Sequence, residues 1–138
     1  MARLAITIGA QRFEAELLPD VAPATCASLP NILPLQAPCV HVRWSGEAVW
    51  VPLGTKDLGG LGYENATSYP APGQLLLYAG DLSEVEILVP YGPTHFASKA
   101  GTLAGNHFAT IASGLDRLAE AGRAVLWQGA AEARFELI

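Results

Sequence analysis

The chain begins with two stretches in which apolar and polar residues alternate, and this pattern constrains the fold more than any other feature. Residues 4–8 (LAITI) and 13–17 (FEAEL) place apolar side chains at every second position. A period of two is typical of strands that bury one face. Because Gly9 and Ala10 lie between the two stretches, we expect a β-hairpin.

Similar signals recur along the chain between turn-forming residues. They predict further strands at residues 40–44, 48–51, 74–78, 85–89, 108–111, 124–127 and 134–138. We interpret residues 85–89 as a continuous apolar run and expect a central strand there. About eight short strands separated by turns are typical of a closed antiparallel barrel.

Two short helices are expected to cap this barrel. The first begins near Pro23, because proline suits the first turn of a helix. It either ends at Pro30 or is followed there by a separate turn through Leu33. The second runs from Ser113, as the N-cap residue, to Gly122, as the C-terminal glycine.

Two segments, residues 53–73 and 91–106, are rich in glycine and are predicted to be long loops. Loops of this length are uncommon in a compact domain and are often functional. The second loop ends in Gly105 and Asn106, and His107 follows directly before a predicted strand. We therefore expect His107 to face a cleft.

Composition narrows the possible partners. The 138 residues have the length of one domain, spanning residues 1–138. Only 15% of them are charged, against about 25% in typical soluble domains. We therefore expect exposed apolar surface, and with it a homo-oligomer or a large apolar cleft. The net charge of −5 includes no basic run, which argues against nucleic acid as a partner.

Other patterns argue against a membrane protein and against a metal site. No apolar run approaches the roughly 18 residues of a membrane span, and the alternating first strand does not resemble a signal peptide. Cys26 and Cys39 are expected to be reduced thiols of a cytoplasmic protein. The three histidines lack ligand-like spacing, so we expect no metal. Without a glycine-rich phosphate loop we expect no cofactor.

Five segments, taken in order, resemble the cyclophilins. Residues 13–25 (FEAELLPDVAPAT) resemble the second strand and first helix entry of that family, and residues 72–80 (PGQLLLYAG) resemble its Pro-Gly strand. Residues 86–89 (EILV) are similar to its central strand and residues 105–107 (GNH) to its Gly-x-His loop, while residues 113–122 fall where its second helix does. The loops look more like those of an uncharacterised bacterial group of cyclophilin-like proteins. The resemblance implies a mainly β fold, namely a closed eight-stranded cyclophilin-like barrel with two short capping helices.

The resemblance also implies a site. In cyclophilins an arginine on the third strand hydrogen-bonds the peptide carbonyl and the prolyl nitrogen, which weakens the conjugation that resists rotation about the amide bond. Arg43 matches that arginine if one gap is allowed in its hairpin, and Val42 takes the position without the gap. The binding cleft would lie beside the loop that carries His107.

Three positions depart from the cyclophilin pattern. Leu88 stands where the family has the aromatic floor of its proline pocket, and Thr102 stands where it has a tryptophan. Trp50 or Val51 corresponds to a glutamine that assists the arginine. Together these departures suggest a ligand other than a prolyl peptide.

Arg43 and His107 are the candidate catalytic residues. The forked donors of an arginine suit a carboxylate or carbonyl, and a histidine in a cleft can act as acid, base or donor. Each also has a purely structural interpretation, because Arg43 could either face solvent or pair with Glu47 across the turn, and His107 could hydrogen-bond loop backbone. On a strand, His41 would face the same side as Arg43. The candidate ligand-binding residues are Trp50, Glu64, Tyr69, Leu88 and Tyr91.

The sequence therefore predicts a bacterial cyclophilin-like protein that binds a small carboxylate- or amide-containing ligand between the Arg43 hairpin and the His107 loop. One alternative is a weak peptidyl-prolyl isomerase that acts on proline-containing peptides. Another is a non-catalytic oligomeric interaction module. An enzyme of this kind would be an isomerase or would act on small amides or carboxylates.

Overall fold

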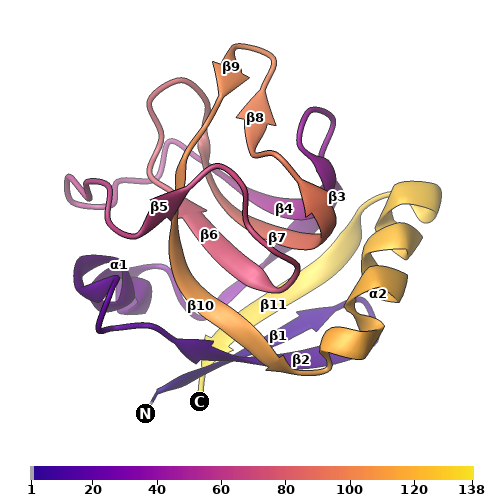
Figure 1. The fold of residues 1–138 in the computed structure, drawn as a ribbon. Coiled ribbons are helices and arrows are strands. Elements are labelled where there is room, and N and C mark those ends of the chain that lie inside the picture. Colours follow the sequence, from indigo (N-terminus) through magenta and orange to yellow (C-terminus); the bar gives the residue numbers. More distant parts are fainter. Residues whose placement is uncertain (1) are drawn as a thin grey trace.

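Nine of the strands form one antiparallel sheet that closes on itself, in a computed structural model that describes residues 2–138 (Figure 1). The elements follow in the order β1 (Arg3–Ile8), β2 (Gln11–Leu17), α1 (Pro23–Ser28), η1 (Leu29–Asn31), β3 (Leu35–His41), β4 (Gly46–Gly54), β5 (Ala66–Thr67), β6 (Gln74–Tyr78), β7 (Val85–Thr94), β8 (Ala97–Ser98), β9 (Gly101–Thr102), β10 (Gly105–Ser113), α2 (Leu115–Gln128) and β11 (Ala131–Leu137).

Closure of the barrel depends on the pairing of β2 with β10. The strand order is β2-β1-β11-β3-β4-β7-β6-β10, and β10 pairs back with β2 through Ala109 opposite Leu17 and Ile111 opposite Ala15. Closing a sheet in this way removes the exposed strand edges that invite aggregation. The predicted eight-stranded antiparallel barrel with two short helices is therefore confirmed. The short strand β5 adds to β10, and β8 and β9 form a separate hairpin.

Two apolar clusters pack on opposite faces of the same strands. The barrel interior holds Val49, Val51 and Ile87, while the alternate positions Trp50 and Leu88 belong to a smaller cluster outside. That outer cluster also takes in Ala48, Leu76, Tyr78, Phe96 and Leu103. In a strand that is buried on both faces, apolar residues need not alternate with polar ones and can follow one another. This explains the apolar run that predicted a central strand at residues 85–89.

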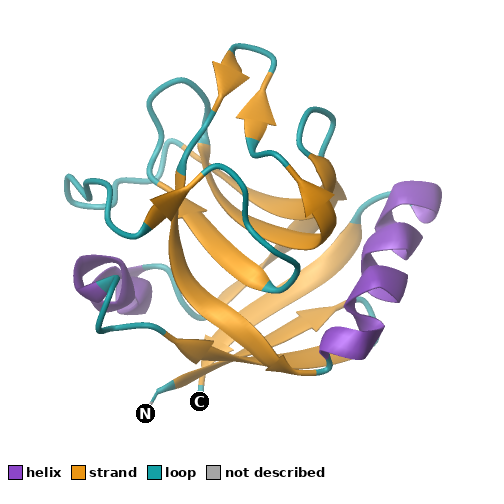
Figure 2. Cartoon of the chain, in the orientation of Figure 1, coloured by secondary structure: helices purple, strands orange, loops and turns teal. Residues whose placement is uncertain are grey.

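The two helices lie on opposite sides of the barrel (Figure 2). The first predicted helix is confirmed as α1, and of the two alternatives at Pro30 the separate turn is observed, as η1. The helix α2 buries Leu118, Ala121 and Val125 against the barrel interior. Within residues 2–138, no helix combines the length and the apolar character needed to cross a membrane.

The strand predicted at residues 40–44 was wrong in its position. The observed strand β3 begins at Leu35 and ends at His41, so Arg43 and Trp44 lie in the turn to β4. Pro38 obscured the beginning of this strand, because proline cannot donate a ladder hydrogen bond. Here it is accommodated because β4 pairs with β3 only at Val40 and His41.

The strand predicted at residues 124–127 was also wrong, because these residues continue α2. Gly122, expected to end the helix, lies within it and faces the ring of Tyr91. Ser113, expected as the N-cap, is the last residue of β10, and Gly114 takes the cap position with φ of 92°. The helix therefore begins without a side-chain cap.

Much of the predicted loop at residues 91–106 is strand. The strand β7 continues to Thr94, β8 and β9 form a hairpin, and β10 begins at Gly105. The predicted loop at residues 53–73 is interrupted only by the end of β4 and by β5. Extension of β7 carries the chain beyond the barrel and places the β8–β9 hairpin over the outer apolar cluster, where Phe96 and Leu103 are buried.

Replacement of Gly122 by alanine is expected to destabilise the protein. A Cβ at this position would overlap the ring of Tyr91. Overpacking costs about 1–3 kcal/mol and outweighs the gain of up to about 1 kcal/mol in helix propensity. Urea unfolding of Gly122→Ala measures this loss. Gly62→Ala is the control, since its Cβ would meet nothing within 4 Å. A Gly122→Ala variant as stable as the wild type would contradict the packing of Tyr91 on α2.

Candidate functional site

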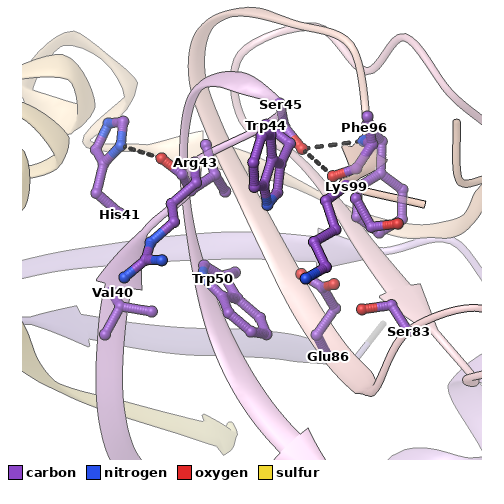
Figure 3. Close-up of a pocket in the computed structure, with 13 residues that line it drawn as sticks. Val40, His41, Arg43, Trp44, Ser45, Trp50, Ser83, Glu86, Phe96 and Lys99 are labelled. Carbon is purple, nitrogen blue, oxygen red and sulfur yellow. Dashed lines mark hydrogen bonds between the residues drawn. The ribbon is translucent and has the colours of Figure 1, made fainter. Parts of the chain in front are cut away.

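A pocket of about 440 Å³ lies outside the barrel, between the β3–β4 turn and the β8–β9 hairpin (Figure 3). Residues 40–45 form one wall and residues 96–99 form the other. The strands β4 and β7 contribute Trp50 and Glu86, and Ser83 comes from the turn before β7. Pockets that hold small ligands have volumes of about 300–1,000 Å³, so this one has the size of a small-molecule site.

The pairing of β4 with β7 brings Trp50 and Glu86 to the same face. Trp50 pairs with Leu88, and Pro52 pairs with Glu86. Side chains of paired residues share a face of the sheet, and positions two apart on one strand do so as well. Glu86 therefore points outward beside Trp50, although its neighbours Val85 and Ile87 are turned the other way.

Ser45 joins the two walls of the pocket. Its hydroxyl donates to the carbonyl of Ala97 at 3.1 Å and accepts from the backbone N–H of the same residue at 3.0 Å. The backbone N–H of His95 donates to the carbonyl of Ser45 at 2.9 Å. Ser45 is buried despite its position in a turn, so these bonds hold the β3–β4 turn against the hairpin.

Glu86 is a buried carboxylic acid without a partner. Its side chain is 5% exposed, and no hydrogen bond or ion pair to it is formed by any of residues 2–138. In the described part of the chain, every side-chain polar atom that is fully shielded from solvent has a hydrogen-bond partner. Because the carboxyl oxygens of Glu86 have none, they are not fully shielded and must reach the open space of the pocket that Glu86 lines. Burial, with a smaller contribution from Glu84, raises the pKa of Glu86 from 4.5 to about 8. At neutral pH this acid therefore keeps its proton.

Arg43 and Lys99 bring positive charge to the mouth of the pocket. Both are exposed, and neither guanidinium nor ammonium forms an ion pair with any residue of the described chain. The pairing of Arg43 with Glu47, one of its two structural interpretations, is therefore not formed. Trp44 lies beside Arg43 and is 57% exposed, so an aromatic ring and two cations surround the entrance.

His41 lines the pocket and is held from two sides. Its Nδ1–H donates to the carbonyl of Val42 at 2.9 Å, and the hydroxyl of Tyr91 lies 2.8 Å from Nε2. Because a carbonyl can only accept, Nδ1 carries the hydrogen, and in the neutral ring Nε2 accepts from Tyr91. Tyr91 itself is buried behind the pocket wall against Gly122. Burial also raises the pKa of Tyr91.

His107 does not lie in this pocket. It belongs to β10, and its Nε2 pairs with the hydroxyl of Thr110 at 2.8 Å. Burial lowers the pKa of His107, which favours the neutral ring. The structure therefore does not bring His107 and Arg43 to one pocket.

Glu64 stabilises the loop that carries it. Its carboxylate accepts from the backbone N–H of Thr25 in α1. The side chain of Asn106 completes the arrangement, since its oxygen accepts from the N–H of Glu64 at 3.1 Å and its nitrogen donates to the hydroxyl of Thr25 at 3.1 Å and the carbonyl of Gly62 at 2.9 Å. Both polar side chains are used in attaching residues 62–64 to α1.

The remaining predicted residues also lie outside the pocket. Tyr69 is 70% exposed and stacks on the ring of His95 at 4.7 Å. Leu88 is fully buried in the outer apolar cluster, against which Trp50 packs. Of the seven predicted site residues, the pocket therefore contains Arg43 and Trp50.

Sequence reasoning missed Glu86, Lys99, Ser45 and Trp44. Glu86 did leave a signal, because it is the one charged residue within the apolar run at residues 85–89. A charge in a strand buried on both faces indicates either a partner or a functional position. Within residues 2–138, no cluster of three or more His, Cys, Asp or Glu side chains could hold a metal ion.

Comparison with known proteins gives a family for the chain. Residues 4–137 match the family described as "Protein of unknown function (DUF3830)". The chain belongs to this family. A search of curated proteins finds no match.

Among solved structures, the chain is similar to the one titled "Structure of McbB in complex with tryptophan", with a TM-score of 0.71 and 20% sequence identity. The match covers 96% of this chain and 44% of that one, so the chain spans less than half the length of this structural relative. At this identity the similarity shows a shared fold.

The stability of the protein is expected to fall with rising pH because of Glu86. Between pH 4.5 and about 8 the carboxyl is charged in the unfolded chain but still protonated in the folded one. The free energy of unfolding should therefore drop, relative to Glu86→Gln, by up to about 1.4 kcal/mol per pH unit in this range. The pH-dependent loss of unfolding free energy, relative to Glu86→Gln, should be small below pH 4.5 and should reach a constant value above about pH 8.

Urea unfolding of both proteins from pH 4 to 9 measures this difference. Glu120→Gln, an exposed position on α2, is the control and should follow the wild type throughout. A constant difference between the wild type and Glu86→Gln over the whole range would contradict a protonated Glu86.

Proposed function

We propose that the protein binds a small organic carboxylate, or an amide, in the pocket between the β3–β4 turn and the β8–β9 hairpin. The observation that carries this proposal is an exposed, unpaired Arg43 guanidinium at the mouth of a pocket lined by Trp44 and Trp50. A guanidinium offers a planar fork of donors that matches a carboxylate and also suits a carbonyl oxygen.

The aromatic rings supply the other half of the recognition. Trp50 packs on the outer apolar cluster and Trp44 is largely exposed. Large rings of this kind contribute apolar contact area at low entropic cost. A ligand with an apolar or aromatic body and one anionic or carbonyl group would satisfy both features of the pocket.

The tryptophan in the McbB structure belongs to that protein. With 20% identity it supports the barrel as a scaffold for a small-molecule site, and the proposed ligand class rests on the charges and rings of this chain. Lys99, at the end of the opposite wall, is a second cation that favours an anionic ligand.

Removal of the Arg43 side chain is expected to weaken binding of a carboxylate. We use 4-methylbenzoate as the probe, since it combines an aromatic body with one carboxylate. Loss of a charge-assisted hydrogen bond costs about 1.5–3 kcal/mol, so Arg43→Ala should bind roughly ten- to a hundredfold more weakly. Isothermal titration calorimetry at low salt measures the affinity.

Arg134→Ala is the matched control, because Arg134 is exposed on β11 and does not line the pocket. It should bind 4-methylbenzoate as the wild type does. Equal affinity of the wild type and Arg43→Ala would remove Arg43 from the site.

The isomerase alternative needs an apolar proline pocket, and we expect it to fail. Leu88, at the position of the cyclophilin pocket floor, is fully buried under the outer cluster, so it offers a proline ring no surface. A protease-free prolyl isomerase assay on the wild type and Arg43→Ala should show no acceleration by either protein. Activity that Arg43→Ala abolishes would instead support the cyclophilin mechanism.

Self-association, the third alternative, has support from exposed apolar side chains. Trp127 is 82% exposed on α2, and Leu126 and Leu115 on the same helix are exposed as well. None of these positions lines the pocket, so an oligomer and a ligand site are compatible.

A further inference from the structure

Glu86 is the feature of the pocket that a simple carboxylate ligand leaves unexplained. A buried acid normally has a hydrogen-bond donor or a cation as its partner. Glu86 has neither among residues 2–138, and its oxygens face the pocket. A ligand anion beside Glu86 could accept only one hydrogen bond from the protonated acid and would be repelled by the ionised one. The position instead suits a ligand group that donates hydrogen bonds.

Arg43 and Glu86 lie on different sides of Trp50, and the side chain of Lys99 extends from the hairpin wall on the Glu86 side. In Figure 3 the ring of Trp50 lies between the side chain of Arg43 and that of Glu86. The two groups come from different elements, since Arg43 belongs to the wall formed by the β3–β4 turn and Glu86 to the strand β7 between the two walls. A ligand that used both would carry its opposite charges at its two ends, with its apolar body on the indole ring.

Resting on the proposed function, we propose that the ligand is an amino carboxylate whose ammonium group binds Glu86 and whose carboxylate binds Arg43, with an apolar body between them. An ammonium group has three donors and a full charge, so it satisfies both carboxyl oxygens. The carboxylate at the other end faces Arg43.

Binding of an ammonium group has a proton balance that can be measured. The free protein carries a proton on Glu86 at pH 7, because the pKa of this buried carboxyl is about 8. The ammonium group replaces that proton, which passes to the buffer, while the ligand keeps its own. Close to one proton per bound ligand should be released at pH 7 and almost none at pH 9, where Glu86 is already ionised.

The other charged groups near Glu86 could also contribute to a pH dependence. Glu84 precedes it in the chain, Lys99 lies on the hairpin wall, and Arg43 and His41 lie on the turn wall. The ring of His41 is held by Val42 and Tyr91. The Glu86→Gln variant retains all of these groups, so any pH dependence that it loses belongs to Glu86.

Three probes test the proposal at pH 8 by calorimetry. The amino carboxylate 4-(aminomethyl)benzoate has its charges at opposite ends of a ring, 4-methylbenzoate lacks only the amine, and phenylglycine is an isomer with both charges on one carbon. We expect the first to bind at least about tenfold more tightly than the other two, as for a hydrogen bond to a charged group. Glu86→Gln should lose this preference, and the control Glu120→Gln should keep it.

The outcomes separate this inference from the proposed function. Equal binding of 4-(aminomethyl)benzoate and 4-methylbenzoate, with both weakened in Arg43→Ala, would overturn the inference and leave the proposed function intact. Binding of phenylglycine as tight as that of 4-(aminomethyl)benzoate would overturn the placement of the two charges at opposite ends of the ligand. Failure of all three probes to bind at millimolar concentration would overturn both proposals.

Proton release by the wild type provides a readout that needs no variant. 4-(Aminomethyl)benzoate is titrated at pH 7 in phosphate and in Tris, whose ionisation enthalpies differ. The two binding enthalpies should differ by close to the difference between these ionisation enthalpies, as expected when one proton passes to the buffer. Buffer-independent enthalpies would show that no proton leaves on binding, and would overturn the pairing of an ammonium group with Glu86.

Discussion

The architecture depends on the burial of β4, β6 and β7 on both of their faces. Inner positions such as Val49 and Ile87 fill the barrel, and the outer positions Leu76 and Leu88 form a second cluster under the β8–β9 hairpin. Apolar burial contributes about 25 cal/mol per Å² of surface removed from water, so the hairpin is held on the barrel by the cluster it covers. The pocket exists because this hairpin and the β3–β4 turn project over the same face.

The same burial gives Glu86 its unusual state. A carboxylate on an exposed strand would titrate near its ordinary value, but the outer cluster and the hairpin remove water from around this one, and desolvation disfavours the charged form. Some stability is lost to place an acid there without a partner. Such a cost is typical of functional sites, where a ligand supplies the partner that the folded chain does not.

Part of the site could be recognised in the sequence, and part could not. Arg43 and Trp50 were found because their residue types suit a ligand and both belong to one predicted hairpin. His107 was expected to face Arg43, but β10 lies on the other side of β6 and β7 from the pocket wall formed by β3 and β4. Glu64 was read as a possible site acid, yet its carboxylate binds the N–H of Thr25. These differences arise from strand order in the barrel, which local spacing does not specify.

The sequence by itself determined the secondary elements whose signals are local. Alternation over residues 4–8 and 13–17 specifies a hairpin, and the apolar run that became β7 specifies a buried strand. Tertiary structure decided the rest. The role of Gly122 depended on Tyr91, because the ring packs where a side chain would stand and so requires a glycine inside α2. The pocket and the protonation of Glu86 depended on the β8–β9 hairpin, because only contacts between distant segments remove water from a side chain.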